Sequence, residues 1–359
     1  MNPRLDALIC VRAIACALAL AATSRAAVAA SPPPPHYSVA ARWPLGGEGG
    51  WDYLTIDATA RRLFVTHADH VEVLDLATGH PVGSIADTAG VHGVALARDR
   101  NRGYTSNGRA NTVTAFALDT LQVIATAPVA GINPDAILYE PRNGRVFTFN
   151  GRSSDATVLD AETLKPIATI PLPGKPEFAV SDGAGEVFVN IEREQGQIVA
   201  IDGKTLGIRA TWDLPGCAEP SGLAFDVAHH RLFSVCDHGV MVVTDSVSGR
   251  QVARVPIGNG PDAVAFDPKS GLVFSSNGED GTLTIVHADD ADHYRPVATL
   301  ATKATARTLA LDPVTGRIYL AAADLVAATE PPPPAGRPRR QVAPGSFVIL
   351  VAQPDQVDR

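Results

Sequence analysis

The chain has 359 residues, among them 31 Gly and 28 Pro, and a formal net charge of −8 at pH 7. The many turn-forming residues favour short strands and argue against a helical bundle. The acidic balance argues against a general nucleic-acid binder, because such proteins are expected to be basic.

Residues 1–30 have the layout of a secretory signal peptide. Arg4 and Arg12 lie at the opening of an apolar, Ala-rich run, and Ala27-Val28-Ala29 offers a cleavage site. The run is too short to span a bilayer, and no later stretch reaches about 18 apolar residues. We therefore expect a periplasmic or secreted chain with no transmembrane segment after cleavage. A lipoprotein anchored through Cys16 is the weaker alternative, because the preceding residues lack the usual Leu.

Residues 31–359 contain one pattern seven times: a Gly/Pro-rich loop, a short apolar strand, a tight turn and a second apolar strand. The first strands of the seven units begin, in chain order, at Asp52, His92, Asp135, Glu177, Ser221, Asp262 and Arg307. These starts are 40 to 45 residues apart. A four-stranded antiparallel unit at this period is typical of a propeller blade. The sequence therefore predicts an all-β, seven-bladed β-propeller of four-stranded antiparallel blades.

The sixth unit shows four predicted strands most clearly, at 263–266, 272–275, 283–286 and 295–300. The seventh has predicted strands at 308–311, 317–320 and 347–351, and no fourth strand follows. The segment 37–45 matches the fourth strands of other units. We therefore expect this N-terminal strand to complete the last blade and close the ring, which leaves no unpaired blade edge.

The second strands at 63–67, 187–190 and 273–277, together with loops of the G-x-x-P-[DE] type, resemble the YVTN-repeat propellers, the YncE-like family of exported bacterial proteins. The resemblance covers about residues 36–352. It implies a periplasmic or surface propeller of seven blades. Functions in and around this family include single-stranded DNA binding, lactone hydrolysis and quinone- or haem-dependent catalysis. Because one fold serves many functions, the resemblance does not fix the activity.

The cysteines divide between the signal peptide and the propeller. Cys10 and Cys16 lie in the signal peptide, and Cys217 and Cys236 remain in the mature chain. An even pair in an oxidising compartment predicts a disulfide, with two separate buried thiols as the alternative. The stretch 216–236 also resembles a subgroup of the family that carries a paired cysteine.

In a propeller, the loops between blades share one face with the loops between second and third strands. We call it the top face, and the seven strand starts lie there around the mouth of the central channel. Four carboxylates with a histidine and an arginine suit a polar ligand or a cation. The alternative is that each side chain bonds the backbone of its own loop. The candidate ligand-binding residues are Asp52, His92, Asp135, Glu177, Asp262 and Arg307.

A second set of polar residues ends the second strands, namely Asn107, Asn150, Asn190 and Asn277. Three of the four precede Gly, and Asn-Gly is a turn signal, so we assign this set to structure. His67 and His70 share one loop and His92 lies one blade away, which leaves a small metal site between blades one and two open. No haem, phosphate-loop or zinc motif is present. We predict no cofactor, with a divalent cation at the channel mouth as the open possibility.

Residues 324–346 interrupt the last blade on the top face with a Pro-rich segment that carries three Arg. Such segments are extended and semi-rigid. We expect either a lid or docking segment over the mouth, or an insertion without function.

These observations predict a ligand-binding or protein-interaction module that acts through the channel mouth. Its partner is an unknown small ligand or a periplasmic or outer-membrane protein, and we expect a monomer. The alternative is an enzyme of lactonase or lyase type that uses a divalent ion at the same mouth. Single-stranded DNA binding has less support, because it needs a positive groove with stacking aromatics.

Overall fold

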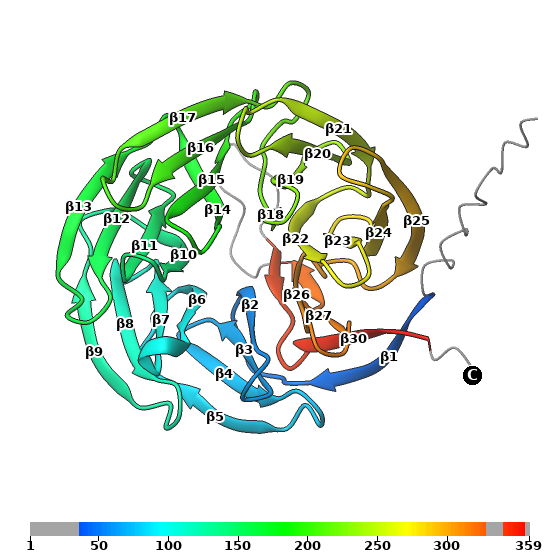
Figure 1. The fold of residues 1–359 in the computed structure, drawn as a ribbon. Helices are drawn as coiled ribbons and strands as arrows, with labels where there is room; N and C mark the ends of the chain where they lie inside the picture. Colours follow the sequence, from blue (N-terminus) through cyan, green and yellow to red (C-terminus); the bar gives the residue numbers. More distant parts are fainter. Residues whose placement is uncertain (1–35, 328–339, 356–359) are drawn as a thin grey trace, which may run out of the picture. The chain divides into compact units, whose positions relative to one another are not determined.

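The computed structural model describes residues 36–327 and 340–355 (Figure 1). Their regular structure is β-strand apart from one 3-10 turn, η1 (Arg98–Arg100). The strands form seven four-stranded sheets and one two-stranded hairpin. The seven sheets stand as blades around a central axis (Figure 1), which confirms the predicted propeller. Within these ranges no helix is long and apolar enough to cross a membrane. The predicted signal peptide, residues 1–30, lies outside the described residues.

Each of the first six blades uses four consecutive strands, with the first nearest the axis and the fourth at the outside (Figure 1). Blades one to three consist of β2 (Trp51–Asp57), β3 (Arg62–His67), β4 (His70–Asp75), β5 (Pro81–Ile85), β6 (Val91–Ala97), β7 (Arg102–Asn107), β8 (Thr112–Ala117), β9 (Val123–Pro128), β10 (Pro134–Glu140), β11 (Arg145–Asn150), β12 (Asp155–Asp160) and β13 (Pro166–Pro171). Blades four to six consist of β14 (Lys175–Ser181), β15 (Glu186–Glu192), β16 (Gln197–Asp202), β17 (Ile208–Asp213), β18 (Leu223–Asp226), β19 (Arg231–Cys236), β20 (Val240–Asp245), β21 (Gln251–Pro256), β22 (Pro261–Asp267), β23 (Leu272–Asn277), β24 (Thr282–Ala288) and β25 (Tyr294–Ala301).

Blade seven joins the two ends of the described chain. From the axis outward it contains β26 (Thr308–Leu311), β27 (Ile318–Ala322), β30 (Val348–Pro354) and β1 (Tyr37–Pro44). β1 runs antiparallel to β30, with Tyr37 opposite Pro354 and Pro44 opposite Val348. Figure 1 shows the two strands side by side at the outer edge of the blade. The predicted closure by the N-terminal strand is confirmed.

The acid that ends most first strands caps the turn that follows. Asp57 Oδ1 accepts a hydrogen bond from the amide of Ala60 at 2.8 Å, and Asp312 Oδ1 accepts one from the amide of Val314 at 3.0 Å. These bonds satisfy backbone donors that the strand ladder leaves unpaired. The recurring acid is therefore part of the turn on the face opposite the top.

A tryptophan covers the turn between the third and fourth strands in two blades. Gly79 (φ 73°) and Gly249 (φ 74°) adopt a left-handed conformation that favours glycine. An added Cβ would lie 2.2 Å from the Trp43 ring at Gly79 and 2.1 Å from the Trp212 ring at Gly249. Both glycines are therefore required twice, by their backbone angle and by the ring packed on them.

Seven clusters of buried apolar side chains fill the seven interfaces between neighbouring blades. Phe64 of blade one packs on Phe116 of blade two with ring centroids 5.8 Å apart, and Phe188 of blade four packs on Phe225 of blade five at 5.3 Å. Full burial of such a side chain contributes about 1.5–3 kcal/mol. Because each blade is buried on both faces, the top-face loops stand on a rigid ring.

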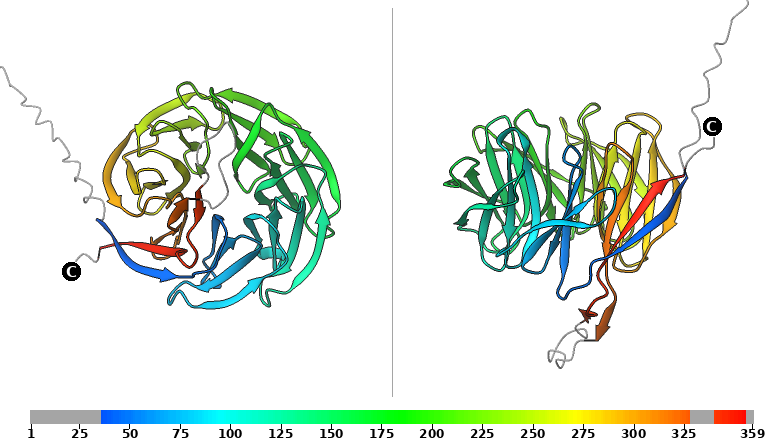
Figure 2. Two further views of the ribbon diagram at one scale, coloured as in Figure 1. Left: turned by 180° about the vertical axis from the view of Figure 1, so that it is seen from behind. Right: turned by 90° about the horizontal axis from the view of Figure 1, so that it is seen from below.

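The segment after β27 begins and ends as a hairpin. β28 (Leu325–Ala327) pairs with β29 (Arg340–Val342), and the hairpin stands out from one face of the ring (Figure 2). At its base the amide of Ala343 donates to the carbonyl of Asp324 at 2.8 Å, and Lys303 Nζ lies 2.8 Å from Asp324 Oδ1. The strand side chains of β28 are exposed.

Candidate functional site

Five of the six candidate residues lie in β-bulges on the innermost strands. The pairing register between first and second strand shifts at each of these points: Asp52 in β2, His92 in β6, Asp135 in β10, Glu177 in β14 and Asp262 in β22. A bulge inserts an extra residue on one strand and redirects its side chain. The sixth candidate, Arg307, directly precedes β26. The bulges and the ring together bring the six side chains to the channel mouth.

One side of the mouth holds a histidine between two aspartates. His92 Nδ1 lies 2.6 Å from Asp52 Oδ2 and 3.5 Å from Asp135 Oδ1. The backbone of the aspartates is also fixed, because the amide of Asp52 donates to Thr66 Oγ1 at 3.1 Å and Ser106 Oγ donates to the carbonyl of Asp135. The three side chains form one group, in which His92 hydrogen-bonds Asp52 and lies within ion-pair distance of Asp135.

Arg307 neutralises two acids of the ring at once. Its Nη1 forms an ion pair with Asp262, and its Nη2 lies 3.6 Å from Asp52 Oδ1 and donates to the carbonyl of Trp51 at 3.1 Å. Ser221, which starts the fifth unit, donates instead to the carbonyl of Pro261 at 2.9 Å. Arg307 therefore crosses from blade seven to blades one and six.

Glu177 belongs to a separate group with a lysine. Lys175 Nζ contacts both Glu177 and Glu192, and Glu177 also hydrogen-bonds Glu192. Because Lys175 precedes Glu177 by two residues on β14, their side chains project to the same side of the strand. Lys175 is thus a mouth residue that sequence reasoning missed and that strand alternation could have found.

Burial raises the pKa values of three ring carboxyls, those of Asp135, Glu177 and Asp262. Burial and the nearby Asp52 charge raise the pKa of Asp135 to about 6. Burial, the hydrogen bond with Glu192 and the Asp135 charge raise the pKa of Glu177 to about 9, which outweighs the effect of Lys175. Burial alone would raise the pKa of Glu192, but its hydrogen bonds with Glu177 and Lys175 lower it. Glu177 therefore holds a proton near pH 7, and Glu192 carries the charge.

The pKa values of His92 and Asp262 are both raised, which favours the charged imidazole of His92 and the neutral carboxyl of Asp262. Burial disfavours a charged imidazole, but the hydrogen bond to Asp52 and the Asp135 charge raise the pKa of His92 overall. Burial raises the pKa of Asp262, against the opposing charge of Arg307. Ionisable groups with shifted pKa values are concentrated at functional sites.

Two adjoining cavities open at the mouth. The larger has a volume of about 660 Å³ and the smaller about 470 Å³, which is the range of small-molecule sites. Residues Gly50, Trp51, Asp52 and Arg307 line both. Tyr53 and Leu325 also line the larger cavity, so the base of the insertion hairpin reaches the mouth.

The two cavities carry opposite charge. Eight carboxyl groups and two cationic side chains line the larger one, including Glu219, Asp237 and Glu279. Three arginines, His92 and a single carboxylate line the smaller one, including Arg109 and Arg152. Among the described residues, no ion pair involves Glu219, Asp237, Glu279, Arg109 or Arg152. The mouth therefore offers unpaired acids on one side and unpaired arginines on the other.

The disulfide holds part of the acidic wall. Cys217 and Cys236 are bonded, with Cα atoms 5.2 Å apart, so the predicted pairing is confirmed. The next residues along the chain, Ala218 and Asp237, form an isolated β-bridge. Glu219 and Asp237 are thereby fixed beside each other at the cavity.

The second ring of polar residues is structural. Asn107 Nδ2 donates to Thr112 Oγ1 at 3.0 Å and to Thr114 Oγ1 at 2.9 Å, and Asn277 repeats this pattern with Thr282 and Thr284. All four asparagines are fully buried. Asn107, Asn150 and Asn277 secure the loops between second and third strands, as their Asn-Gly turn signals indicate. Asn190 instead donates to the carbonyls of Ser221 and Gly222 in blade five.

The chain matches no family model, and no curated protein matches it in sequence. Among solved structures it is similar to hydrazine synthase of Kuenenia stuttgartiensis, with 17% identity and a TM-score of 0.65 over 76% of this chain and 92% of that chain. It is also similar to the WD40 repeats of RRP9, with 9% identity and a TM-score of 0.69 over 89% of this chain and 99% of that chain. At these identities the similarity concerns the β-propeller fold alone.

Proposed function

We propose that this propeller is a binding module that captures a small ligand with separated positive and negative groups at its channel mouth. The observation that carries the proposal is the opposite charge of the two adjoining cavities. A cationic group fits beside Glu219 and Asp237, and an anionic group fits beside Arg109 and Arg152. Arg307 and Asp52 lie between them because they line both cavities.

The mouth is suited to binding because its own charges are held in place beforehand. Asp52, Asp262 and Glu192 already pair with His92, Arg307 and Lys175 respectively, so these groups form a fixed floor. Ordering the floor costs nothing when a ligand arrives, and preorganisation of this kind favours affinity. The unpaired acids and arginines at the rim are left to recognise the ligand.

Isothermal titration calorimetry with three probes tests the proposal: a Lys-Glu dipeptide, a diamine and a dicarboxylate. We expect the dipeptide to bind at least about tenfold more tightly than either of the probes that carry charge of one sign only, a difference of about 1.4 kcal/mol. The double variants Arg109→Gln/Arg152→Gln and Glu219→Gln/Asp237→Asn should each remove this advantage. Arg42→Gln, on the outer strand β1, is the control. Equal affinity for all three probes in the wild type would contradict the proposal.

The compartment and the family are part of the same proposal. The signal-like residues 1–30 and the disulfide support a periplasmic or secreted chain, because structural disulfides persist in oxidising compartments. The repeat motifs support the YVTN-repeat assignment. Detection of a mature chain that starts near residue 30 in a periplasmic extract, by mass spectrometry, tests the location.

A hydrolytic or lyase activity at the same mouth is the second candidate. It is favoured by Glu177, a carboxyl that carries a proton near pH 7 because its pKa is raised to about 9 and that lines the larger cavity. Such a group can act as a general acid. A panel of lactones assayed with the wild type and with Glu177→Gln tests this role. Turnover by the wild type that Glu177→Gln abolishes would support it, and absence of turnover would leave binding alone.

A further inference from the structure

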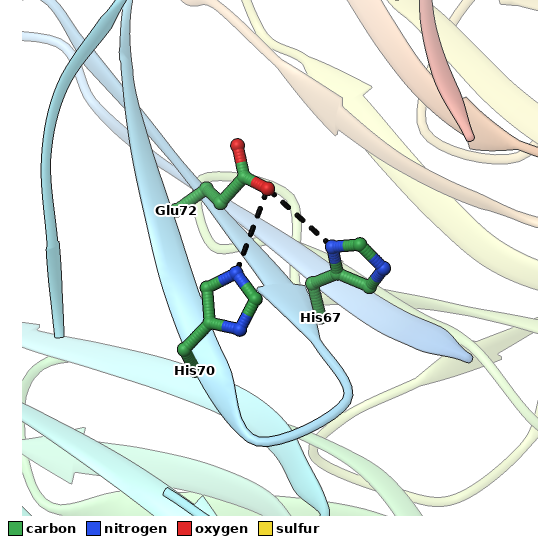
Figure 3. A group of neighbouring side chains, drawn as sticks. All are labelled: His67, His70 and Glu72. Carbon is green, nitrogen blue, oxygen red and sulfur yellow. Dashed lines mark hydrogen bonds and ion pairs between the residues drawn. The ribbon is translucent and has the colours of Figure 1, made fainter. Parts of the chain in front are cut away.

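Two histidines and a glutamate converge at the hairpin between the second and third strands of blade one. His67 ends β3, His70 begins β4, and Glu72 is two residues further along β4. His67 Nδ1 lies 3.4 Å and His70 Nε2 lies 3.5 Å from the same oxygen, Glu72 Oε1 (Figure 3). Each of the three residues offers one potential metal-ligand atom, and these three atoms all lie within 4.8 Å of one another.

These separations are long for ion-paired hydrogen bonds but fit ligands of one metal ion. A hydrogen bond between an imidazole and a carboxylate is expected at about 2.7–2.9 Å, and His92 and Asp52 approach to 2.6 Å in this same chain. Two ligand atoms at about 2.0–2.1 Å from a tetrahedral zinc ion lie about 3.3–3.4 Å apart. Both nitrogens face one carboxylate oxygen at that spacing.

The surroundings fix both imidazole rings. His67 and His70 are paired across a two-residue turn. His70 Nδ1 lies 3.1 Å from Asp69 Oδ1, and a carboxylate in this position orients a metal-binding histidine and sets its tautomer. His67 is buried, and its ring centroid lies 4.6 Å from that of Phe347. An added Cβ on Gly47 would lie 2.6 Å from the His67 ring, so glycine leaves the space that the ring occupies.

The group has an opening to solvent on the side of Glu72. Glu72 lines a cavity of about 340 Å³ together with Trp43 and His80. The side chain of His70 is one-third exposed. An ion therefore has an entry path, and the fourth coordination position remains available to water, as in zinc sites with three protein ligands.

We propose that His67 Nδ1, His70 Nε2 and a Glu72 carboxylate oxygen bind one divalent transition-metal ion, with zinc as the best fit. The donor set of two imidazoles and one carboxylate is typical of this class of ion. The site differs from the channel mouth, since none of the three residues lines either mouth cavity. It lies at the seam of the ring, where the amides of Leu45 and Gly46 both donate to the carbonyl of Phe347. Because all three ligands belong to β3 and β4, bound metal would fix this hairpin of blade one beside the junction of β1 and β30.

Titration of the mature, metal-free chain with Zn²⁺ tests the proposal, with calorimetry to measure affinity and a thermal melt to measure stabilisation. We expect one zinc ion per chain and a rise in melting temperature, because a ligand that binds the folded state stabilises it. His70→Asn and Glu72→Gln, both at partly exposed positions, should each weaken zinc binding by about 100-fold or more. With Co²⁺ in place of Zn²⁺, the visible bands of a tetrahedral ion should appear in the wild type and be lost in both variants.

The control is the double variant Asp290→Asn/His293→Asn, which removes an exposed acid–histidine pair with Nδ1 2.9 Å from the carboxylate. It should bind zinc as the wild type does. Asp135→Asn tests the other histidine and acid group, Asp52, His92 and Asp135. Absence of zinc binding in the wild type, or wild-type affinity in Glu72→Gln, would overturn the proposal. Zinc that is retained by Glu72→Gln and lost in Asp135→Asn would place the ion at the mouth, which also overturns it.

Discussion

The carboxyl groups of the mouth avoid mutual repulsion in two ways, through internal cations and through retained protons. Arg307 and His92 both pair with Asp52, and Arg307 also pairs with Asp262. The sequence did not predict these pairings. Glu177 stays neutral because burial raises its pKa. Arg307, His92 and Lys175 thus supply cationic partners within the described residues, at the mouth where a divalent cation was an open possibility.

The protonated Glu177 gives the fold a pH dependence. Its pKa rises from an ordinary 4.5 to about 9 in the folded chain. Between these values the folded state holds a proton that the unfolded state has lost, so the free energy of unfolding falls as pH rises. We expect a loss on the order of a few kcal/mol between about pH 5 and pH 9. Asp135 contributes to the same loss of stability at the acidic end of this range, because its pKa rises from an ordinary 3.8 to about 6 in the folded chain.

Urea unfolding of the wild type and Glu177→Gln at several pH values measures this effect. Glutamine keeps the neutral shape, so the variant should match the wild type near pH 5 and be more stable near pH 9. The exposed Glu48 offers the control Glu48→Gln. The expectation fails if both variants show the same pH dependence as the wild type.

The disulfide should contribute to stability through the unfolded state. Cys217 and Cys236 are 19 positions apart, and closing a loop of this length is worth about 3 kcal/mol. We expect Cys217→Ser/Cys236→Ser to lower the free energy of unfolding by about this amount. Reductant should lower the free energy of unfolding of the wild type by the same amount and leave that of the double variant unchanged. A wild type that is insensitive to reductant would show that the bond does not stabilise the fold.

Residue identity alone predicted which side chains reach the mouth but not how they pair. The seven predicted strand starts lie within two residues of the observed ones, because the repeat gives their approximate register. Arg307 of blade seven pairs with Asp262 of the adjacent blade six. Lys175 and Glu177 of β14 meet Glu192 only because β14 pairs with β15. Such contacts come from tertiary structure, which a local pattern does not contain. The proximity of Glu72 to His67 and His70 was missed for a simpler reason, because alternation along β4 was not applied to it.

At the scale of elements, the predicted strands agree closely with those observed. In blade six the predicted 263–266 is β22 (Pro261–Asp267), and in blade seven 308–311 is β26 (Thr308–Leu311). The bulges were not predicted, because an extra residue in a first strand leaves the apolar pattern nearly unchanged. They are nevertheless the feature that directs the five ring side chains inward.

The insertion hairpin should be dispensable for folding. Its strands β28 and β29 pair only with each other, and their flanking residues Asp324 and Ala343 are already hydrogen-bonded. Replacing residues 326–341 with Asn-Gly, a two-residue hairpin turn, keeps the pair of Leu325 and Val342, of which Val342 packs on the core between blades seven and one. This change should alter the free energy of unfolding by no more than about 0.5 kcal/mol. A thermal melt measures this. A fall of many degrees would show that the segment packs on the ring.

At the scale of the whole molecule, the ring is held by seven similar interfaces and one closure. β1 supplies the outer strand of blade seven, and Tyr37 is buried against Phe274 of blade six with ring centroids 5.2 Å apart. The closure was predictable because the last unit lacked a fourth strand while the first residues matched one. Removing β1 would leave β30 as an exposed, apolar edge.

A chain that starts at Leu45 should therefore be much less stable than one that starts at His36. We expect the loss to exceed that of a single large core substitution, about 2–5 kcal/mol, and we expect oligomers or aggregates. Thermal melts and size-exclusion chromatography of the two chains measure both effects. The chain from His36 is the matched control, because it keeps β1 and removes only what precedes it. A soluble, monomeric Leu45 chain of equal stability would contradict the closure.

The pairing of β1 with β30 also has a consequence for how the protein folds. His36 and Asp355, whose side chains lie 3.1 Å apart, are 319 positions apart in the sequence. The blades form from contacts within about 40 residues, but this contact requires nearly the whole chain to be present. Contacts between residues so far apart in the sequence form late, because the chain loses the entropy of closing a long loop before any contact is gained. During synthesis, β1 therefore stays unpaired until β30 has been made. In that interval its apolar residues are exposed to chaperones and to misassembly with other chains.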